Sequence, residues 1–337
     1  MPGKDWTPEE LFQVNAQTWT ACAIQAAVKL DLFTALDSSE TPGLTEAELA
    51  RKLGLNPRAL GMLATAMTSL GFLDRDGDRL SLTNTSHRYL SAKSDDYYGF
   101  AILHSAHILP AWTRLADSVK SGTHSSDRCT QNTGEDEAQR EAFLMGMFNI
   151  ARRQADRVAA AFDLTGRRRL LDLGGGPGTY ALYFCRHYPE LTATVFDQPT
   201  TEKFARSVAK KYELTDRVDF VGGDFLSDDI PQGFDVAWLS QILHGENPAD
   251  AARLVARGAV ALNPGGILAV QEFIIDDDRK GPVQPSLFAL NMLVQTDGGQ
   301  AYTEGEIRSM LADAGLTNIR RLQADLPPGC GIVVGDK

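Results

Sequence analysis

The sequence predicts an α/β protein with an open, mostly parallel, doubly wound sheet, preceded by a mainly helical N-terminal part. Two observations predict this fold class. From residue 169 onward, short apolar runs alternate with stretches of helical composition, which is typical of a parallel sheet covered by helices on both faces. Before residue 169, apolar residues recur mainly at helical spacing, and one hairpin pattern interrupts them.

The length of 337 residues exceeds that of one average domain. A stretch rich in Ser, Asp, Thr, Asn and Gly separates the two kinds of pattern and indicates a linker. We therefore expect a helical domain over residues 1–124, a linker over 125–137 and an α/β domain over 138–337. The hydrophobic fraction of 43% is ample for a core in each domain.

In the N-terminal part, residues 8–37 have apolar positions spaced mainly by three and four, which predicts amphipathic helix. Thr45 and Glu48 form a capping box that begins a second helix, and Asn56-Pro57 begins a third. Two short strands joined around Asp76-Gly77 then predict a hairpin. This order of elements is that of a winged helix. Helix is also expected over residues 96–121, with a break at Pro110, and over 138–163.

A winged helix raises the possibility of DNA binding. The helix that would read the bases, residues 57–70, carries only Arg58 as a charged residue, whereas base readout needs Arg, Lys, Asn or Gln. The formal net charge of −11 and the isoelectric point near 5.1 also disfavour nucleic acid as a partner. We therefore expect a dimerisation module, and a ligand-sensing DNA-binding regulator remains an alternative.

The α/β domain begins at the stretch 169–178, RLLDLGGGPG, which reads as a buried strand, a glycine turn and a helix. Such a turn lets backbone amides approach a nucleotide-like ligand at the positive end of a helix. The elements expected after it are helix 179–188, strand 192–197, helix 200–212, strands 217–222 and 234–240, helix 248–262, strand 266–273, helices 286–295 and 303–314, and strands 317–323 and 331–335.

The glycine turn alone leaves the ligand open. Gly176-x-Gly178-x-x-Ala181 satisfies the dinucleotide pattern, and Asp197 follows at the usual distance for a ribose contact, so a nicotinamide cofactor is possible. The alternation Gly174-x-Gly176-x-Gly178, with Asp172 just upstream, more closely resembles the first motif of the Rossmann-type methyltransferases that use S-adenosylmethionine.

Composition excludes several other classes. The four cysteines form no CxxC pair or cysteine/histidine cluster, so free thiols in a reducing cytoplasm are expected. No secretory signal and no run of about 18 apolar residues is visible, which predicts a cytoplasmic protein without a membrane partner. His104 and His107 lack a third ligand, and the acidic run 276–278 lacks a supporting ligand set, so no metal site is predicted.

Further segments, taken in order, make the chain similar to one family over nearly its whole length. The family comprises the small-molecule O-methyltransferases of the plant caffeate, acetylserotonin and bacterial antibiotic-tailoring type, which carry an N-terminal winged-helix dimerisation domain. The resemblance implies a Rossmann-type, seven-stranded methyltransferase sheet, a homodimer, and S-adenosylmethionine as cofactor with S-adenosylhomocysteine as product. The matching segments are AAVKLDLFTAL (26–36), LTEAELA (44–50), LDLGGGPG (171–178), VFDQP (195–199), GGDF (222–225), LSQILH (239–244), LNPGG (262–266) and GGQAYT (298–303).

The resemblance also implies a set of cofactor contacts. Asp172, Gly174 and Gly176 would border the methionine part, and Asp197 would bind the ribose. Adenine would be held by Asp224 and Phe225, with Gly223 also among the cofactor-binding residues, while Ser240 occupies the place of a cofactor-contacting lysine in plant members.

His244 matches the family's catalytic base, and Glu272 matches one of the two carboxylates that fix the imidazole. A phenol with a pKa of about 10 is mostly neutral at pH 7, whereas a histidine with a pKa of about 6.5 is mostly a free base, so this assignment is chemically sensible. Two positions depart from the pattern. Ala301 replaces the second carboxylate, and Gly245 stands where plant members commonly have Asp.

The predicted reaction is methyl transfer from S-adenosylmethionine to a hydroxyl of an aromatic or polyketide-like small molecule. C-methylation or non-methyl chemistry with the same cofactor is the alternative within the fold. Met147, Phe148 and Asn149, on the helix expected over residues 138–163, are candidate residues of the substrate pocket. Weaker candidates by the same resemblance are Trp112, Phe288, Asn291 and Met292.

Overall fold

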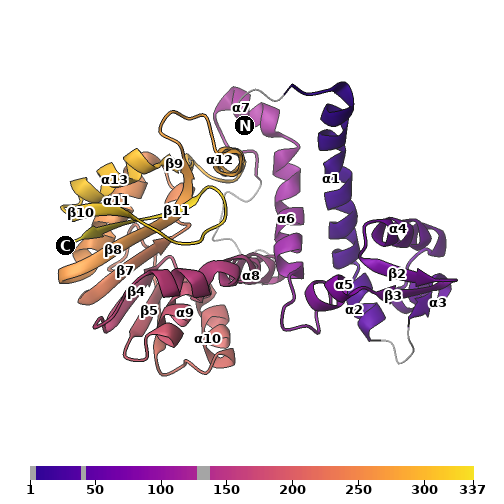
Figure 1. The fold of residues 1–337 in the computed structure, drawn as a ribbon, viewed down its shortest axis with the longest axis horizontal. Coiled ribbons are helices and arrows are strands. Elements are labelled where there is room, and N and C mark those ends of the chain that lie inside the picture. Colours follow the sequence, from indigo (N-terminus) through magenta and orange to yellow (C-terminus); the bar gives the residue numbers. More distant parts are fainter. Residues whose placement is uncertain (1–4, 39–42, 127–136) are drawn as a thin grey trace. The chain divides into compact units, whose positions relative to one another are not determined.

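The computed structural model describes residues 5–38, 43–126 and 137–337, and it divides the chain into two compact units, residues 1–107 and 108–337. Each unit is described by itself (Figure 1). The division falls within one helix, α6 (Gly99–Trp112), and most of the expected linker, together with Cys129, lies outside the described residues. The domain boundaries at 124 and 138 therefore stay a prediction.

The N-terminal unit is a helical bundle with a small three-stranded sheet in the order β1-β3-β2. The capping box of Thr45 and Glu48 is present, because the Thr45 hydroxyl accepts from the Glu48 amide and Glu48 accepts from the Thr45 amide at 2.8 Å. Besides the start of α6, its elements are α1 (Pro8–Lys29), α2 (Leu32–Asp37), β1 (Leu44–Thr45), α3 (Glu46–Leu53), α4 (Pro57–Ser69), β2 (Leu73–Asp76), β3 (Arg79–Leu82) and α5 (Asn84–Tyr89).

The helix expected over residues 8–37 is interrupted, because Asp31 adopts a φ of +57° and separates α1 from α2. Within α1 only Ala27 and Val28 are buried. The apolar residues of its first two-thirds do not pack into the core of this chain: Leu11, Phe12, Val14 and Trp19 are 50–69% exposed.

The break expected at Pro110 is also wrong, since α6 continues to Trp112. Pro110 lies in the last turn of the helix, where its missing N–H removes only one hydrogen bond. The chain leaves the helix after Trp112 and begins α7 (Leu115–Ser121).

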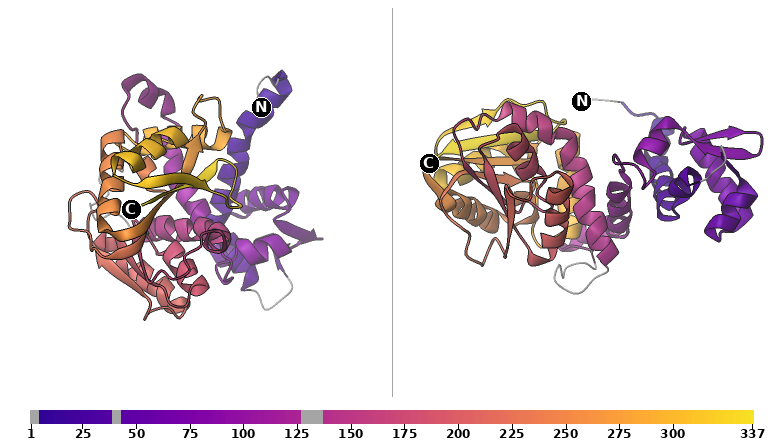
Figure 2. Two further views of the ribbon diagram at one scale, coloured as in Figure 1. Left: turned by 60° about the vertical axis from the view of Figure 1, so that its left-hand side comes forward. Right: turned by 90° about the horizontal axis from the view of Figure 1, so that it is seen from below.

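The C-terminal unit holds the predicted sheet between two layers of helices (Figure 2). Its main path has the strand order β10-β11-β8-β7-β4-β5-β6, with β9 paired to β8 off this path. Its strands are β4 (Arg169–Leu173), β5 (Thr192–Asp197), β6 (Val218–Gly222), β7 (Phe234–Ser240), β8 (Leu262–Ile275), β9 (Tyr302–Thr303), β10 (Thr317–Leu322) and β11 (Cys330–Asp336). Its remaining helices are α8 (Glu137–Ala161), α9 (Thr179–His187), η1 (Pro199–Thr201), α10 (Glu202–Lys211), η2 (Leu243–Gly245), α11 (Pro248–Ala261), α12 (Val283–Gln295) and α13 (Glu304–Asp313).

Two apolar cores flank this sheet, one on each face. One core joins α8, α9 and α10 to the sheet around Trp238, and the other joins α11 and α13 around Leu239. These neighbouring residues of β7 point to opposite faces, as the period of a strand requires. Strands β4 to β8 pair in parallel and β11 is antiparallel to β8, so the predicted fold class is confirmed.

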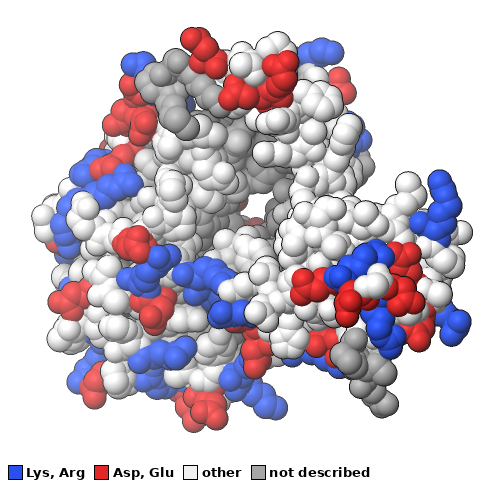
Figure 3. Space-filling view, turned by 45° about the vertical axis from the view of Figure 1, so that its right-hand side comes forward, with Lys and Arg blue, Asp and Glu red and all other residues white. Residues whose placement is uncertain are grey.

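On the face shown in Figure 3, acidic and basic side chains are interspersed and form no continuous basic patch. An acid also lies against α4, the helix that would read DNA. A Cβ added at Gly61 would stand 2.7 Å from Oε2 of Glu46, whose other oxygen pairs with Arg75 at 2.7 Å. No helix in the described ranges is long and apolar enough to cross a membrane.

Candidate active site

The predicted cofactor-binding and catalytic residues lie at or just beyond the carboxyl ends of five neighbouring parallel strands, β8, β7, β4, β5 and β6. From β4 the chain proceeds to β5 and β6 on one side, and it then returns to place β7 and β8 on the other. The strand order therefore reverses between β4 and β7, and ligands of open α/β sheets bind at such a switch point. Gly174 follows β4 and Ser240 ends β7, on the two sides of this point.

Gly174 is required at the turn after β4. Its φ is +68°, and a Cβ there would come within 1.7 Å of Cδ1 of Ile242, in the segment that follows β7. Gly176 also has a positive φ, +54°, and its amide donates to Oδ2 of Asp197 at 2.8 Å. The turn after β4 is thus tied to the end of β5.

Asp172 is buried beneath this turn, with a side chain only 1% exposed. Its Oδ2 accepts from the amide of Ala181 at 3.2 Å, whereas its buried Oδ1 has no hydrogen-bond partner. Burial raises the pKa of Asp172 to about 7, because few groups compensate a charge there. An unpartnered buried carboxylate oxygen is costly and fits a site that receives a cationic or donating ligand group.

The Asp197 carboxylate is held by three donors. Besides the Gly176 amide, the Gln198 amide donates at 2.7 Å and the Thr201 hydroxyl at 3.0 Å. Burial raises the pKa of Asp197, although these hydrogen bonds oppose the rise. Sequence reasoning missed Thr201, a hydroxyl four residues after the acid at the start of the next helix.

The segment after β6 approaches the same edge of the sheet. Gly223 is buried, and a Cβ there would lie 2.5 Å from the ring of Phe196. Oδ1 of Asp224 accepts from the Leu226 amide at 2.8 Å, and Phe225 packs against the core around Leu239.

Ser240, at the end of β7, donates to Oε1 of Gln271 at 3.3 Å. Gln271 is fully buried, and its Nε2 has no partner in the described part of the chain. The sequence analysis missed Gln271, although an adjacent Gln-Glu pair inside the apolar run of β8 is a visible signal.

Glu272 and His244 form the closest side-chain pair among the predicted site residues. Oε2 of Glu272 lies 2.7 Å from Nδ1 of His244, while its Oε1 accepts the amides of Ile242 and Leu243 at 2.8 Å each. Glu272 is 1% exposed and His244 is 13% exposed. One buried carboxylate therefore holds both the backbone that leads into η2 and the imidazole.

This geometry determines the tautomer of His244. An ionised carboxylate only accepts hydrogen bonds, so Nδ1 of His244 must carry the hydrogen. The lone pair of the neutral ring is then on Nε2, and no hydrogen bond of Nε2 is found among residues 5–38, 43–126 and 137–337. A neutral imidazole in this tautomer is able to accept a proton from a substrate hydroxyl.

The two departures from the family pattern lie beside this pair. Ala301 is buried and has no polar side chain, while the amide of Gln300 donates to the His244 carbonyl at 2.9 Å. Gly245 faces open space, because a Cβ there would meet nothing within 4 Å. Glu272 is thus the carboxylate that hydrogen-bonds the imidazole.

Helix α12 also contacts η2, the segment that carries His244. The ring of Phe288 meets the His244 ring edge to face at 4.7 Å between centroids, and Phe273 packs on Phe288 at 4.5 Å. One turn further along α12, Asn291 accepts a hydrogen bond from Nε1 of Trp112 at 2.8 Å. Met292, the next residue, is buried. Phe288, a weaker candidate from the sequence, thus contacts His244 directly, and Trp112 hydrogen-bonds another candidate, Asn291.

The candidates on α8 differ among themselves. Phe148 packs in the core around Trp238 and meets the ring of Tyr212 at 5.9 Å, whereas Met147 is half-buried. Asn149 is 5% exposed, and its Oδ1 has no partner in the described chain. Of the three, Asn149 therefore carries the feature most typical of a ligand site.

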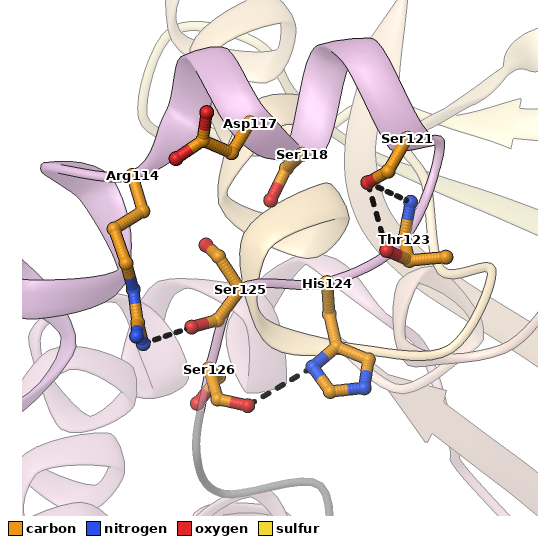
Figure 4. Close-up of a pocket in the computed structure, with 8 residues that line it drawn as sticks. All are labelled: Arg114, Asp117, Ser118, Ser121, Thr123, His124, Ser125 and Ser126. Atoms are coloured by element: carbon orange, nitrogen blue, oxygen red, sulfur yellow. Dashed lines mark hydrogen bonds between the residues drawn. The ribbon is translucent and has the colours of Figure 1, made fainter.

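A separate polar hollow of about 330 Å³ opens beside α7. Figure 4 shows its hydroxyl-rich lining, in which the His124 ring lies 3.0 Å from the Ser126 carbonyl and Arg114 donates to the carbonyl of Ser125. None of the predicted site residues lines this hollow.

The chain matches known proteins over nearly its whole length. A sequence model of the O-methyltransferase domain matches residues 112–317, and one of the O-methyltransferase dimerisation domain matches residues 16–92. The chain is 32% identical over 339 residues to 3-hydroxy-5-methyl-1-naphthoate 3-O-methyltransferase of Streptomyces sahachiroi, covering 100% of this chain and 97% of that protein. It is 34% identical over 318 residues to the tetracenomycin polyketide synthesis 8-O-methyl transferase of Streptomyces glaucescens, covering 93% and 92%.

Among solved structures, human N-acetylserotonin methyltransferase in complex with S-adenosylmethionine superposes with a TM-score of 0.87 at 25% identity, covering 100% of this chain and 99% of that one. The mitomycin 7-O-methyltransferase superposes with a TM-score of 0.84 at 27% identity, covering 98% and 97%. The matches exclude the nicotinamide alternative, and the resemblance is confirmed. The chain belongs to the S-adenosylmethionine-dependent O-methyltransferases that carry a dimerisation domain.

Proposed function

We propose that this enzyme methylates a hydroxyl of a planar aromatic, polyketide-like small molecule, with His244 as the general base. The hydrogen bond between Nδ1 of His244 and Glu272 carries the proposal, because it leaves Nε2 as the acceptor. General base catalysis requires this arrangement of a ring nitrogen free to accept and a second group that orients the ring. The proposed substrate class draws on the relatives, whose names specify a hydroxynaphthoate and a tetracenomycin polyketide.

The aromatic side chains near the base support a planar acceptor. Phe288 contacts the His244 ring and is backed by Phe273, so aromatic side chains lie beside the imidazole. Aromatic rings pack on one another in offset or edge-to-face contacts that add about 0.5–1.5 kcal/mol beyond the burial of area. An aromatic acceptor would therefore be oriented by the same helix that restrains the base.

The residues at the carboxyl ends of the strands are suited to hold S-adenosylmethionine. The buried, unpartnered Oδ1 of Asp172 suits the methionine part, and Asp197 retains accepting capacity for ribose hydroxyls. Asp224 and Phe225 would hold the adenine, with Gly223 and Ser240 at the edges of this site. When bound, S-adenosylmethionine supplies a methyl group already activated by its sulfonium.

Chain residues would then do two things in the reaction. The pocket aligns the acceptor oxygen with the methyl group, and such alignment is a large part of the rate when the reacting group is already activated. Nε2 of His244 takes the hydroxyl proton, and Glu272 stabilises the imidazolium that forms. No metal ligand cluster is found among the described residues, and the proposed chemistry requires none.

The function is tested by incubating the protein with S-adenosylmethionine and hydroxynaphthoates, and by following the mass gain of one methyl group. A methoxy carbon in the product NMR spectrum is expected. A methyl on ring carbon would favour the C-methylation alternative. No product, despite binding of S-adenosylhomocysteine measured by calorimetry, would contradict the proposed substrate class.

Asp172 gives a pH-dependent prediction. If its carboxylate receives the α-ammonium of the cofactor, the ionised form binds more tightly, and that form becomes dominant only above a pKa of about 7. Affinity for S-adenosylhomocysteine should therefore rise about 5- to 10-fold between pH 6 and pH 8. Calorimetric titration at both pH values checks this, and Asp172→Asn should show a flat profile. A rise that persists in Asp172→Asn would refute the assignment.

The stability of the free protein has the opposite dependence. Because burial raises the pKa of Asp172 above its unfolded value, the native state holds the proton longer. The contribution of the protonated Asp172 to the free energy of unfolding is fully present below about pH 4, and it is lost as the pH rises through about 7. Asp172→Asn should thus be more stable than the parent in urea at pH 8, and about equal to it at pH 4.

We also propose that the enzyme is a homodimer in which α1 packs on a second copy. The dimerisation domain match begins at residue 16, and α1 exposes apolar side chains that do not pack into the core of the N-terminal unit. Phe12 and Trp19 meet edge to face at 6.3 Å, so a bulky aromatic surface faces outward. An apolar helix surface of this kind is typical of a subunit interface.

The double change Phe12→Glu and Trp19→Glu should shift the protein toward monomer. Each buried aromatic contributes about 1.5–3 kcal/mol, so the dissociation constant should rise at least about 100-fold. Sedimentation equilibrium measures it. Val260→Glu, at another exposed apolar residue in the catalytic unit, should leave the dimer intact. Unchanged association in the double variant would remove α1 from the interface.

A further inference from the structure

One hydrogen bond beside the proposed pocket joins two residues far apart in the chain. Nε1 of Trp112, at the end of α6, donates to Oδ1 of Asn291 on α12 at 2.8 Å. Both residues belong to the C-terminal unit and both are half-buried. The contact is the one side-chain hydrogen bond found for either residue within the described ranges.

The chemistry of this contact determines which way the Asn291 amide is turned. An indole N–H is a donor only, so its partner must be the amide oxygen. The NH₂ group of Asn291 therefore faces away from Trp112. It has no hydrogen-bond partner in the described structure, and it is not among the buried side-chain atoms that lack one. The group is thus an accessible donor.

Asn291 is placed to use this donor on the acceptor. Phe288 lies three residues earlier on α12 and so on the same face, and its ring contacts His244. Helix α12 also packs against η2, which carries His244. Asn291 therefore lies about one helical turn along α12 from the residue that contacts the base, and on the same face of the helix.

We propose that Trp112 is a positioning residue that locks the Asn291 amide, so that the site offers an N–H donor to a second oxygen of the aromatic acceptor. This inference deepens the proposed function and rests on it. The enzyme then prefers acceptors with an oxygen that accepts hydrogen bonds, in addition to the hydroxyl that is methylated. Acceptors with a donor at that place are disfavoured, because two donors would meet.

Three naphthols that differ at one place test the preference: 2-naphthol, 7-methoxy-2-naphthol and 7-amino-2-naphthol. Their dissociation constants are measured by calorimetry with the dimeric enzyme saturated by S-adenosylhomocysteine. The parent should bind the methoxy compound about 3- to 10-fold more tightly than 2-naphthol, the size of one net hydrogen bond. The amino compound should bind no better than 2-naphthol.

Two variants separate positioning from packing. In Trp112→Phe the amide is free to turn over, so the methoxy preference should fall to about 1 and the amino compound should gain affinity. In Asn291→Asp the outward group becomes an acceptor, so the order should invert in favour of the amino compound. A purely structural role would weaken all three ligands alike and would leave their ratios unchanged.

A retained methoxy preference in Trp112→Phe, or equal binding of the three naphthols by the parent, would overturn the proposal. The hydrogen bond itself is checked by the four tryptophan indole N–H signals in a ¹H–¹⁵N spectrum, of which the Trp112 signal should shift in Asn291→Leu. Because these readouts are binding constants and chemical shifts, they do not depend on turnover. Failure of methyl transfer would count against the proposed function alone.

Discussion

Replacing His244 with alanine should lower the rate of methyl transfer by about 100- to 10,000-fold, the range that a positioned general base contributes. The reason is the geometry at Nε2, the one ring nitrogen left to accept a proton once Nδ1 donates to Glu272. Affinity for S-adenosylhomocysteine should change by less than about 3-fold, because most of the proposed cofactor residues lie at the ends of β4, β5 and β6. Single-turnover kinetics and calorimetry measure the two effects separately.

His187→Ala is the matched control for this variant. His187 lies exposed at the end of α9, and it contacts Tyr188 rather than any site residue. Its replacement should leave turnover within about 2-fold of the parent. If His244→Ala retains full turnover with the same acceptor, His244 is not the base, although the family assignment stands.

Glu272→Gln should be the second most damaging change, with a loss of turnover of about 100- to 10,000-fold and a loss of stability of about 1.5–3 kcal/mol. The side-chain oxygen of the glutamine is able to accept the hydrogen bonds from the amides of Ile242 and Leu243, but the NH₂ group of the glutamine then faces Nδ1 of His244. Nδ1 must then accept a hydrogen bond, so the neutral ring carries its hydrogen on Nε2. The proposed base is lost although the histidine is still present. The hydrogen bonds also lose their charge assistance.

Rate and urea unfolding should be measured together, at a temperature where the variant is fully folded. Glu304→Gln serves as control, since Glu304 is a partly buried carboxylate on α13 that pairs with Arg308 and Arg321. We expect the control to lose some stability and to keep its turnover. A ¹⁵N spectrum of the histidines in Glu272→Gln should show the changed tautomer of His244. An unchanged tautomer would contradict the mechanism.

Local patterns predicted most of the fold correctly, because they depend on near neighbours in the chain. The capping box at Thr45, the hairpin at Gly77 and the glycine turn at Gly174 each require particular residue types at short spacing, and each is present in the structure. The break at Asp31 was missed, since a non-glycine residue in a left-handed conformation leaves no clear pattern. Helical spacing also could not tell whether the apolar residues of α1 pack within their own chain.

The site was predicted unevenly for a similar reason. Gly174, Asp197 and Asp224 follow parallel strands, whose carboxyl ends share one edge of the sheet, and parallel pairing follows from the alternation of elements. No pattern indicates that Trp112 meets Asn291, 179 positions away, or that Thr201 caps the Asp197 carboxylate. Such contacts depend on how helices pack on the finished sheet, which sequence periodicity does not specify.

The double use of Glu272 restricts how this chain is able to change over evolutionary time. The carboxylate accepts hydrogen bonds from the amides of Ile242 and Leu243 independently of the imidazole. Loss of Glu272 would therefore destabilise the fold even in a protein that no longer catalysed the reaction. His244, by contrast, is proposed to remove the proton, and its side chain makes no comparable contribution to the turn. A descendant that abandoned methyl transfer would therefore be free to lose the histidine first, and the orphaned glutamate would persist as a trace of the lost activity.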